Sequence, residues 1–273
     1  MCTVAASYSL VPKSIDILCF PEMIFSGYMF PDSQSISRYL EEPKTGPTSR
    51  LCSELASRLQ CYVTAGYPER LSTEEAEGSK IGANSAVLCG PKGEWIGGFR
   101  KTNLFRTDLI WAKAGTGFTT FTLPPPLNTV SFGICNDLNI NGLTEWSLED
   151  GPYEIADYCI SQKSDLLILL DAWLDSDKAS TDESDWSNIN YWAARLRPLW
   201  VDPTAGGGIS GEENAPKGKE TLVVICNRFG HENGETFAGT SCLLRMRRRS
   251  GRPQLLELMG RREEGVGIWT VSR

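Results

Sequence analysis

The chain has 273 residues, of which 41% are hydrophobic and 22% are charged, a composition that allows a globular protein with a sizeable core. Its 34 acidic and 27 basic residues give a formal net charge of −7, which argues against a general nucleic-acid binder because phosphate binding requires a basic surface. The single histidine, His231, excludes a metal site built from several histidines and leaves carboxylates or lysine as the expected proton carriers.

The first half of the chain alternates short apolar runs with one helical segment. Strands are predicted over residues 15–20, 61–66, 84–89 and 95–100, and an amphipathic helix is predicted over residues 49–59. The turn at residues 91–94 joins the last two of these strands into a hairpin.

The second half adds further strands and helices. Strands are predicted over residues 129–134, 166–170, 221–226, 241–246 and 255–259, helices over 152–161 and 185–195, and a loop over 206–219. Crossovers through helices occur together with hairpins, and this mixture favours an α/β layered fold with a mixed sheet. Because no repeat or linker interrupts the pattern, we expect one domain over residues 1–273.

The nine cysteines do not form a disulfide framework. They include no C-x-x-C pair, and most lie in apolar runs, which favours reduced thiols over disulfides or zinc ligands. The amino-terminal residues lack the pattern of a secretory signal, and no apolar run approaches the roughly 20 residues that span a bilayer. We therefore expect a cytoplasmic protein that binds neither membrane nor nucleic acid.

Three polar residues follow predicted strands and lie far apart in the sequence. They are Glu22, Lys101 and Cys135. Ligand sites of α/β sheets gather at strand ends, so the fold could bring the three side chains together. Each residue also has a simpler interpretation, as a solvated loop glutamate, a surface lysine or an inert core thiol.

Five segments in order resemble those of the nitrilase superfamily. They are FPEMIFSGY at 20–28, RKTNLF at 100–105, GICNDL at 133–138, LLILLDAW at 166–173, and NRFG with FAGTS between 227 and 241. The resemblance implies a four-layer αββα sandwich, in which two sheets pack face to face between layers of helices. It further implies catalysis by Glu22, Lys101 and Cys135, with neither a metal nor an organic cofactor.

The chemistry of these residue types suits amide hydrolysis. By resemblance, the Cys135 thiol attacks the amide carbon and ammonia leaves. Lys101 could favour the thiolate and later the oxyanion, while Glu22 carries protons between the thiol, the leaving nitrogen and water. The backbone N–H of Asn136 would be the second oxyanion donor.

Two departures from the superfamily pattern are visible. A second glutamate usually follows the lysine, and residues 107–111 offer only the shorter Asp108 in its place. The opening strand of the superfamily has little counterpart in residues 1–14, so we expect the sandwich to lack that strand.

A finer resemblance points to fungal protein N-terminal asparagine amidohydrolases. It depends on residues 186–192, 66–69 and 118–121, although the aromatic residues of the first segment could equally be the apolar face of a helix. It implies that the substrates are proteins or peptides that begin with Asn, or also Gln, and that the product enters N-terminal-residue-dependent degradation. It leaves pairing into a homo-oligomer open.

A free amino-terminal ammonium needs a carboxylate close to the nucleophile. Asp137, Asp171 and Asp175 are the candidates, and Trp173 could wall the pocket. Asp137 could instead be a carboxylate that caps a turn, and Trp173 could belong to the core.

Two rival functions stay open. The first is a small-molecule amidase or carbamoylase of the same superfamily, and the second is a truncated, inactive pseudoenzyme or interaction module. The basic residues between 245 and 252 favour a solvated hairpin tip rather than a nucleic-acid patch.

Overall fold

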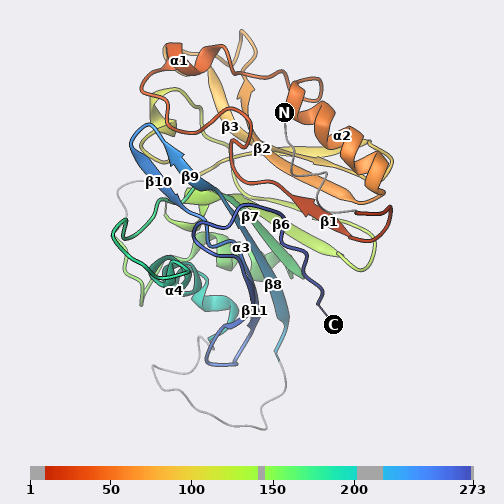
Figure 1. The fold of residues 1–273 in the computed structure, drawn as a ribbon, viewed down its shortest axis with the longest axis vertical. Coiled ribbons are helices and arrows are strands. Elements are labelled where there is room, and N and C mark those ends of the chain that lie inside the picture. The colour runs from red at the N-terminus through yellow and green to blue at the C-terminus, as the bar shows by residue number, and fades with distance from the viewer. Residues whose placement is uncertain (1–9, 141–144, 202–217, 272–273) are drawn as a thin grey trace.

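Two large β-sheets form the centre of the computed structural model, which describes residues 10–140, 145–201 and 218–271 (Figure 1). The first sheet contains, in order, β1 (Ile17–Cys19), β2 (Tyr62–Arg70), β3 (Gly82–Cys89) and β4 (Trp95–Arg100). β1 runs parallel to β2, and the other neighbours are antiparallel. All four strands were predicted, although β2 continues beyond its predicted end.

The second sheet has six strands. Their order is β12 (Gln254–Leu258), β11 (Cys242–Arg247), β8 (Glu220–Asn227), β7 (Leu166–Asp171), β6 (Thr129–Ile134) and β5 (Thr119–Thr122). The central strands β6, β7 and β8 are parallel, and the outer pairs are antiparallel. A separate hairpin of β9 (Phe229–Glu232) and β10 (Glu235–Ala238) lies in a region for which no strand was predicted.

Helices α2 (Pro47–Leu59), α3 (Glu154–Gln162) and α4 (Trp186–Arg195) cover the outer faces of the two sheets. The short helix α1 (Ser33–Ser37) packs Ile36 against Met23 and Trp111 instead. Three 3₁₀ turns are also described, η2 (Asp108–Ile110), η3 (Cys135–Leu138) and η4 (Arg197–Leu199). α2 begins with Pro47 and packs Cys52 and Ala56 against the four-stranded sheet. α4 packs Ile189 and Trp192 against the six-stranded sheet, where α3 also lies.

Strand β7 shows why the layers form. All six of its residues are buried, as expected for a central parallel strand that is covered on both faces. Leu167 and Leu169 contact the helical layer, whereas Ile168 and Leu170 face the four-stranded sheet. Between the sheets, the rings of Phe99 and Phe132 lie 5.0 Å apart. The predicted αββα sandwich is therefore confirmed.

The edge of the four-stranded sheet is formed by β1, which pairs with β2 among the described strands. Residues 1–9 lie outside the described part of the chain, so the missing opening strand stays a prediction, as does the single domain. Most of the predicted loop at 206–219 also lies outside it. Within the described ranges, no helix combines the length and the apolar character that crossing a bilayer requires.

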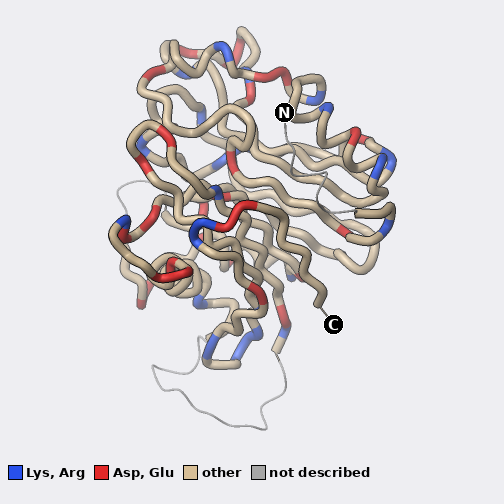
Figure 2. Tube along the Cα trace, viewed as in Figure 1, with Lys and Arg blue, Asp and Glu red and all other residues tan. Residues whose placement is uncertain are grey.

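Charge is distributed unevenly over the molecule. Figure 2 shows lysine and arginine gathered where β11 turns into β12. This turn lies beside the start of β8, at the opposite end of the sheet from the carboxyl ends of β6, β7 and β8. There Arg245 and Arg247 both lie within ion-pair distance of Glu220, at 3.4 and 2.9 Å. This hairpin is the location that the sequence predicted for the basic run.

Candidate active site

Cys135 stands at a sharp turn between a strand and a helical turn. It follows β6 directly and opens η3, with a backbone φ of +45°, which is rare for a residue other than glycine. Such strain persists only where the surroundings impose it, and it is common at active sites. Gly133 allows the approach of α3, because a Cβ there would lie 2.5 Å from Ile155 Cδ1.

Lys101 lies between two buried carboxylates. Its Nζ is 2.7 Å from Glu22 Oε1 and 2.7 Å from Asp108 Oδ2, and all three side chains have 0% exposure. Glu22 follows β1, Lys101 follows β4, and Asp108 begins η2. Asp108 Oδ2 also accepts a hydrogen bond from the Phe105 N–H at 2.9 Å. Asp108 therefore reaches Lys101 although its side chain is a methylene shorter than that of glutamate.

Asn84 and Tyr28 complete this cluster, and the sequence analysis missed both roles. The Asn84 side-chain amide donates to Glu22 Oε1 at 2.6 Å and to Asp108 Oδ1 at 2.9 Å, so it bridges the two carboxylates. The Tyr28 hydroxyl donates to Asp108 Oδ2 at 3.4 Å. The available signal was Asn84 itself, a polar residue in the fully buried strand β3.

The charges of this cluster are strongly coupled. Burial raises the pKa of Glu22, and the charge of Asp108 raises it further, while Lys101 lowers it. Burial lowers the pKa of Lys101, but Asp108 and Glu22 more than offset this, so its pKa lies well above the usual range. Lys101 therefore stays protonated and can supply a fixed positive charge inside the protein.

The Cys135 thiol lies within the electrostatic field of the same groups. Burial raises its pKa well above the usual range, Glu22 raises it further, and Lys101 lowers it. The sulfur accepts a hydrogen bond from the Ala172 N–H, and Cys135 is 7% exposed to solvent. The structure thus brings Glu22, Lys101 and Cys135 together. Lys101 favours the thiolate, as the sequence indicated, but burial and Glu22 outweigh it, so the resting group is a thiol.

The Asp137 carboxylate accepts hydrogen bonds from backbone N–H groups. Its Oδ1 accepts from the N–H groups of Thr102 and Asn103 at 2.8 Å each, and its Oδ2 accepts from the Ile134 N–H at 2.8 Å. Burial raises its pKa to about 6 against these donors. These contacts favour the alternative considered for Asp137, a carboxylate that caps a turn, because they tie η3 to the segment after Lys101.

Asp171, at the end of β7, is placed differently. Its Oδ1 accepts from the Cys135 N–H at 2.9 Å, while its Oδ2 is buried without a hydrogen-bond partner. Asp175, the remaining candidate, forms ion pairs with Arg261 and Arg262. Of the three aspartates proposed for an ammonium, Asp171 alone keeps an unpartnered oxygen.

Trp173 and Asn136 are each held by contacts with neighbouring residues. The Trp173 ring packs 5.3 Å from Tyr191 and 6.2 Å from Trp192, and its buried indole N–H lacks a partner. Asn136 follows Cys135 in η3, and its side-chain amide donates to the carbonyls of Asn103 and Leu104. These contacts hold the backbone beside the thiol.

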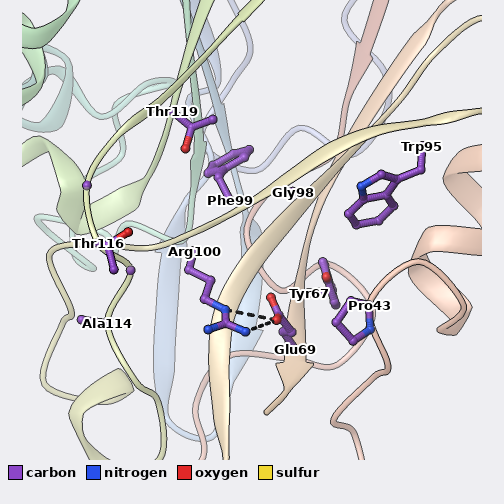
Figure 3. Close-up of a pocket in the computed structure, with 12 residues that line it drawn as sticks. Pro43, Tyr67, Glu69, Trp95, Gly98, Phe99, Arg100, Ala114, Thr116 and Thr119 are labelled. Carbon is purple, nitrogen blue, oxygen red and sulfur yellow. Dashed lines mark hydrogen bonds and ion pairs between the residues drawn. The ribbon is translucent and has the colours of Figure 1, made fainter. Parts of the chain in front are cut away.

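A cavity of about 350 Å³ is lined by Arg100, the residue before Lys101, but not by Lys101 itself. Arg100 extends to Glu69 at 2.5 Å (Figure 3). Glu69 also accepts from the Ser85 hydroxyl, and Arg100 pairs with Glu75 as well. The cavity is therefore separate from the cluster around Cys135.

This chain is similar to known carbon-nitrogen hydrolases. The model of the carbon-nitrogen hydrolase family matches residues 1–154. A Schizosaccharomyces pombe protein named protein N-terminal amidase is 30% identical over 276 residues, which cover 96% of this chain and 88% of that protein. A Saccharomyces cerevisiae protein of the same name is 28% identical over 72% of this chain but only 45% of its own length, so this chain corresponds to less than half of it.

A solved structure supports the same arrangement of the chain. The crystal structure of an N-terminal amidase with an Asn-Glu-Ala peptide superimposes with a TM-score of 0.77. The two are 21% identical, and the match covers 96% of this chain and 89% of that one. At this identity the likeness concerns the fold.

Proposed function

This chain belongs to the carbon-nitrogen hydrolase family, whose members hydrolyse carbon–nitrogen bonds, and we propose that it removes ammonia from N-terminal Asn, and from Gln, of proteins and peptides. The products are N-terminal Asp and Glu. The printed names of the two curated relatives and the peptide bound to the structural relative support this substrate class.

The reaction begins with attack of Cys135 on the side-chain amide carbon. Because the resting thiol is neutral, Glu22 takes its proton as the carbon–sulfur bond forms. The oxyanion is stabilised by the Lys101 ammonium and the Asn136 backbone N–H, and loss of one such donor typically costs about 3–4 kcal/mol of barrier. Asp108 holds Lys101 between the two carboxylates.

Collapse of the tetrahedral intermediate releases ammonia. Glu22 returns the proton to the departing nitrogen, and a thioester on Cys135 remains. Glu22 then deprotonates water, which attacks the thioester carbon, and the sulfur leaves and recovers a proton from Glu22. No metal or organic cofactor takes part in this scheme.

The observation that carries the proposal is the buried arrangement of Lys101 between Glu22 and Asp108, next to a strained Cys135. Desolvating three charges is costly unless they are mutually paired, so the arrangement suits a function more than stability. It also weakens the case for an inactive module, because Asp108 gives Lys101 a second buried carboxylate partner.

The experiment is mass spectrometry on three substrates. The chain should add about one dalton to an Asn-starting peptide, because NH₂ is replaced by OH, and should leave an N-acetyl-Asn peptide and a free small amide unchanged. Cys135→Ala should reduce the rate at least about 1,000-fold. Release of ammonia from the small amide alone would favour a small-molecule amidase, and full activity of Cys135→Ala would overturn the mechanism.

The cellular setting extends this proposal. An N-terminal Asp or Glu can receive a further residue that marks the protein for degradation, so we place the activity in an N-degron pathway of the cytoplasm. Its partners are then protein or peptide substrates, and Trp173 would wall the side of the site that receives their first residue.

A further inference from the structure

The site around Cys135 contains more carboxyl groups than basic groups. Four buried carboxylates, Glu22, Asp108, Asp137 and Asp171, share the single ammonium of Lys101. Arg228 also approaches Glu22, but it does not change the excess of acidic over basic groups. Its partner Glu232, at 3.4 Å, supplies another negative charge. A site of this composition favours a cationic ligand.

Three of these carboxylates already have a role, either in the contacts described above or in the proposed reaction. Asp108 binds Lys101, Asn84 and a backbone N–H, and Asp137 accepts three backbone N–H groups. Glu22 has one unpartnered oxygen, which the proposed reaction uses for proton transfer. That leaves Asp171 Oδ2, which is fully buried and has no hydrogen-bond partner.

We propose that Asp171 binds the α-ammonium group of the substrate's first residue and thereby restricts the enzyme to free amino termini. The inference rests on the proposed function. Oδ1 of Asp171 accepts a hydrogen bond from the backbone N–H of the nucleophile, and the charge of this carboxylate acts on the Cys135 thiol, so Asp171 belongs to the same site. In Asn, the amino nitrogen is separated from the amide carbon by the α and β carbons alone, and in Gln by one further methylene.

The electrostatics agree with this assignment. Burial and the charge of Glu22 raise the pKa of Asp171 well above its usual range, so the ionised carboxylate is poorly stabilised in the empty site. A substrate ammonium would supply the missing opposite charge and the missing donor at once. An acetylated or internal Asn would leave the carboxylate buried without a partner, which is costly.

The test combines one substitution with one change in the substrate. The substrates are an Asn-starting peptide and the same peptide in which the first residue lacks its α-amino group. In the wild-type chain we expect kcat/KM for the amino form to exceed that for the des-amino form by at least about 100-fold. Asp171→Asn keeps the shape and the acceptor for the Cys135 N–H, and should reduce this preference to a few-fold.

Asp175→Asn is the matched control, because it alters a nearby buried aspartate that is paired with arginines, and it should leave the preference unchanged. An equal loss on both substrates in Asp171→Asn would assign the residue a structural role and overturn the inference.

The wild-type arm stands alone if Asp171→Asn does not fold: a preference near unity overturns the inference while leaving deamidation intact. A wild-type chain that deamidates neither peptide contradicts the proposed function instead.

Discussion

Lys101 is held by groups that also set the protonation of the proposed proton carrier. Asp108 contacts its Nζ at 2.7 Å and is bridged to Glu22 through Asn84. The negative charge of Asp108 therefore acts on Glu22 twice, by raising its pKa and by fixing the lysine that lowers it. Asp108 therefore influences the charge state of Glu22 although its side chain is shorter than that of glutamate.

Asp108→Asn should shift the pH dependence of the reaction. The rate requires ionised Glu22, and removal of the neighbouring negative charge removes a cause that raises the pKa of Glu22. The acid limb of kcat/KM should move to lower pH, while the rate at the optimum falls on the order of 100-fold because Lys101 loses a partner. Initial rates over a pH series measure both effects. An acid limb that stays in place or moves upward would contradict the electrostatic argument, and Asp182→Asn on an exposed loop is the control.

The strands place these residues through close backbone contacts. In β2, Gly66 accepts a hydrogen bond from the Ile24 N–H and donates to the Pro21 carbonyl, so it holds the segment that contains Glu22. A Cβ at Gly66 would lie 2.6 Å from the Glu22 Cα and 2.7 Å from the Met23 nitrogen. Two backbones thus approach so closely that only glycine fits between them.

Gly66→Ala should displace Glu22 and reduce activity. The clash involves backbone atoms, which cannot rotate away, so we expect a loss of about 1–3 kcal/mol of unfolding free energy and at least about 10-fold in kcat/KM. Urea unfolding and initial rates measure the two effects. Gly260→Ala, where the nearest atom to the new Cβ is 3.5 Å away, should alter neither quantity. Unchanged activity in Gly66→Ala would show that Glu22 tolerates the shift.

Long-range contacts join the segment that contains Glu22 to the hairpin of β9 and β10. Glu232, on the hairpin of β9 and β10, accepts hydrogen bonds from the Tyr28 N–H at 2.9 Å and the Met29 N–H at 2.9 Å. Arg228 donates to the Met23 carbonyl at 2.6 Å and to the Glu22 carbonyl at 3.2 Å. The segment that carries Glu22 is thus anchored by residues from the other end of the chain.

Glu232→Ala should therefore weaken both stability and activity. It leaves the N–H groups of Tyr28 and Met29 without their acceptor, at a cost of about 1–3 kcal/mol. Chemical denaturation and kcat/KM check the effect. Glu235→Ala, on the same hairpin, breaks a more exposed pair with Lys178 at 3.0 Å and should cost under about 1 kcal/mol. Equal effects of the two substitutions would deny Glu232 its anchoring role.

Local patterns predicted most strands of the central sheets and the longer helices, but they missed β5 and α1. The strand over 129–134 has the bounds of β6, and the helix predicted over 185–195 is α4 with Asp185 as its N-cap, because burial periodicity and capping are properties of neighbouring residues. The strands β9 and β10 were not predicted, since short strands outside the large sheets show little periodicity.

The order of residues along the chain was enough to establish the family pattern, the layered fold and the residue types available for amide hydrolysis. The tertiary structure decided how these residues are used: it gave Asp137 to backbone N–H groups, Asp175 to arginines, and left an oxygen of Asp171 unpartnered. The physical reason is that a carboxylate's role depends on which donors reach it. In a sandwich those donors come from strands far apart in the chain, so no local pattern records them.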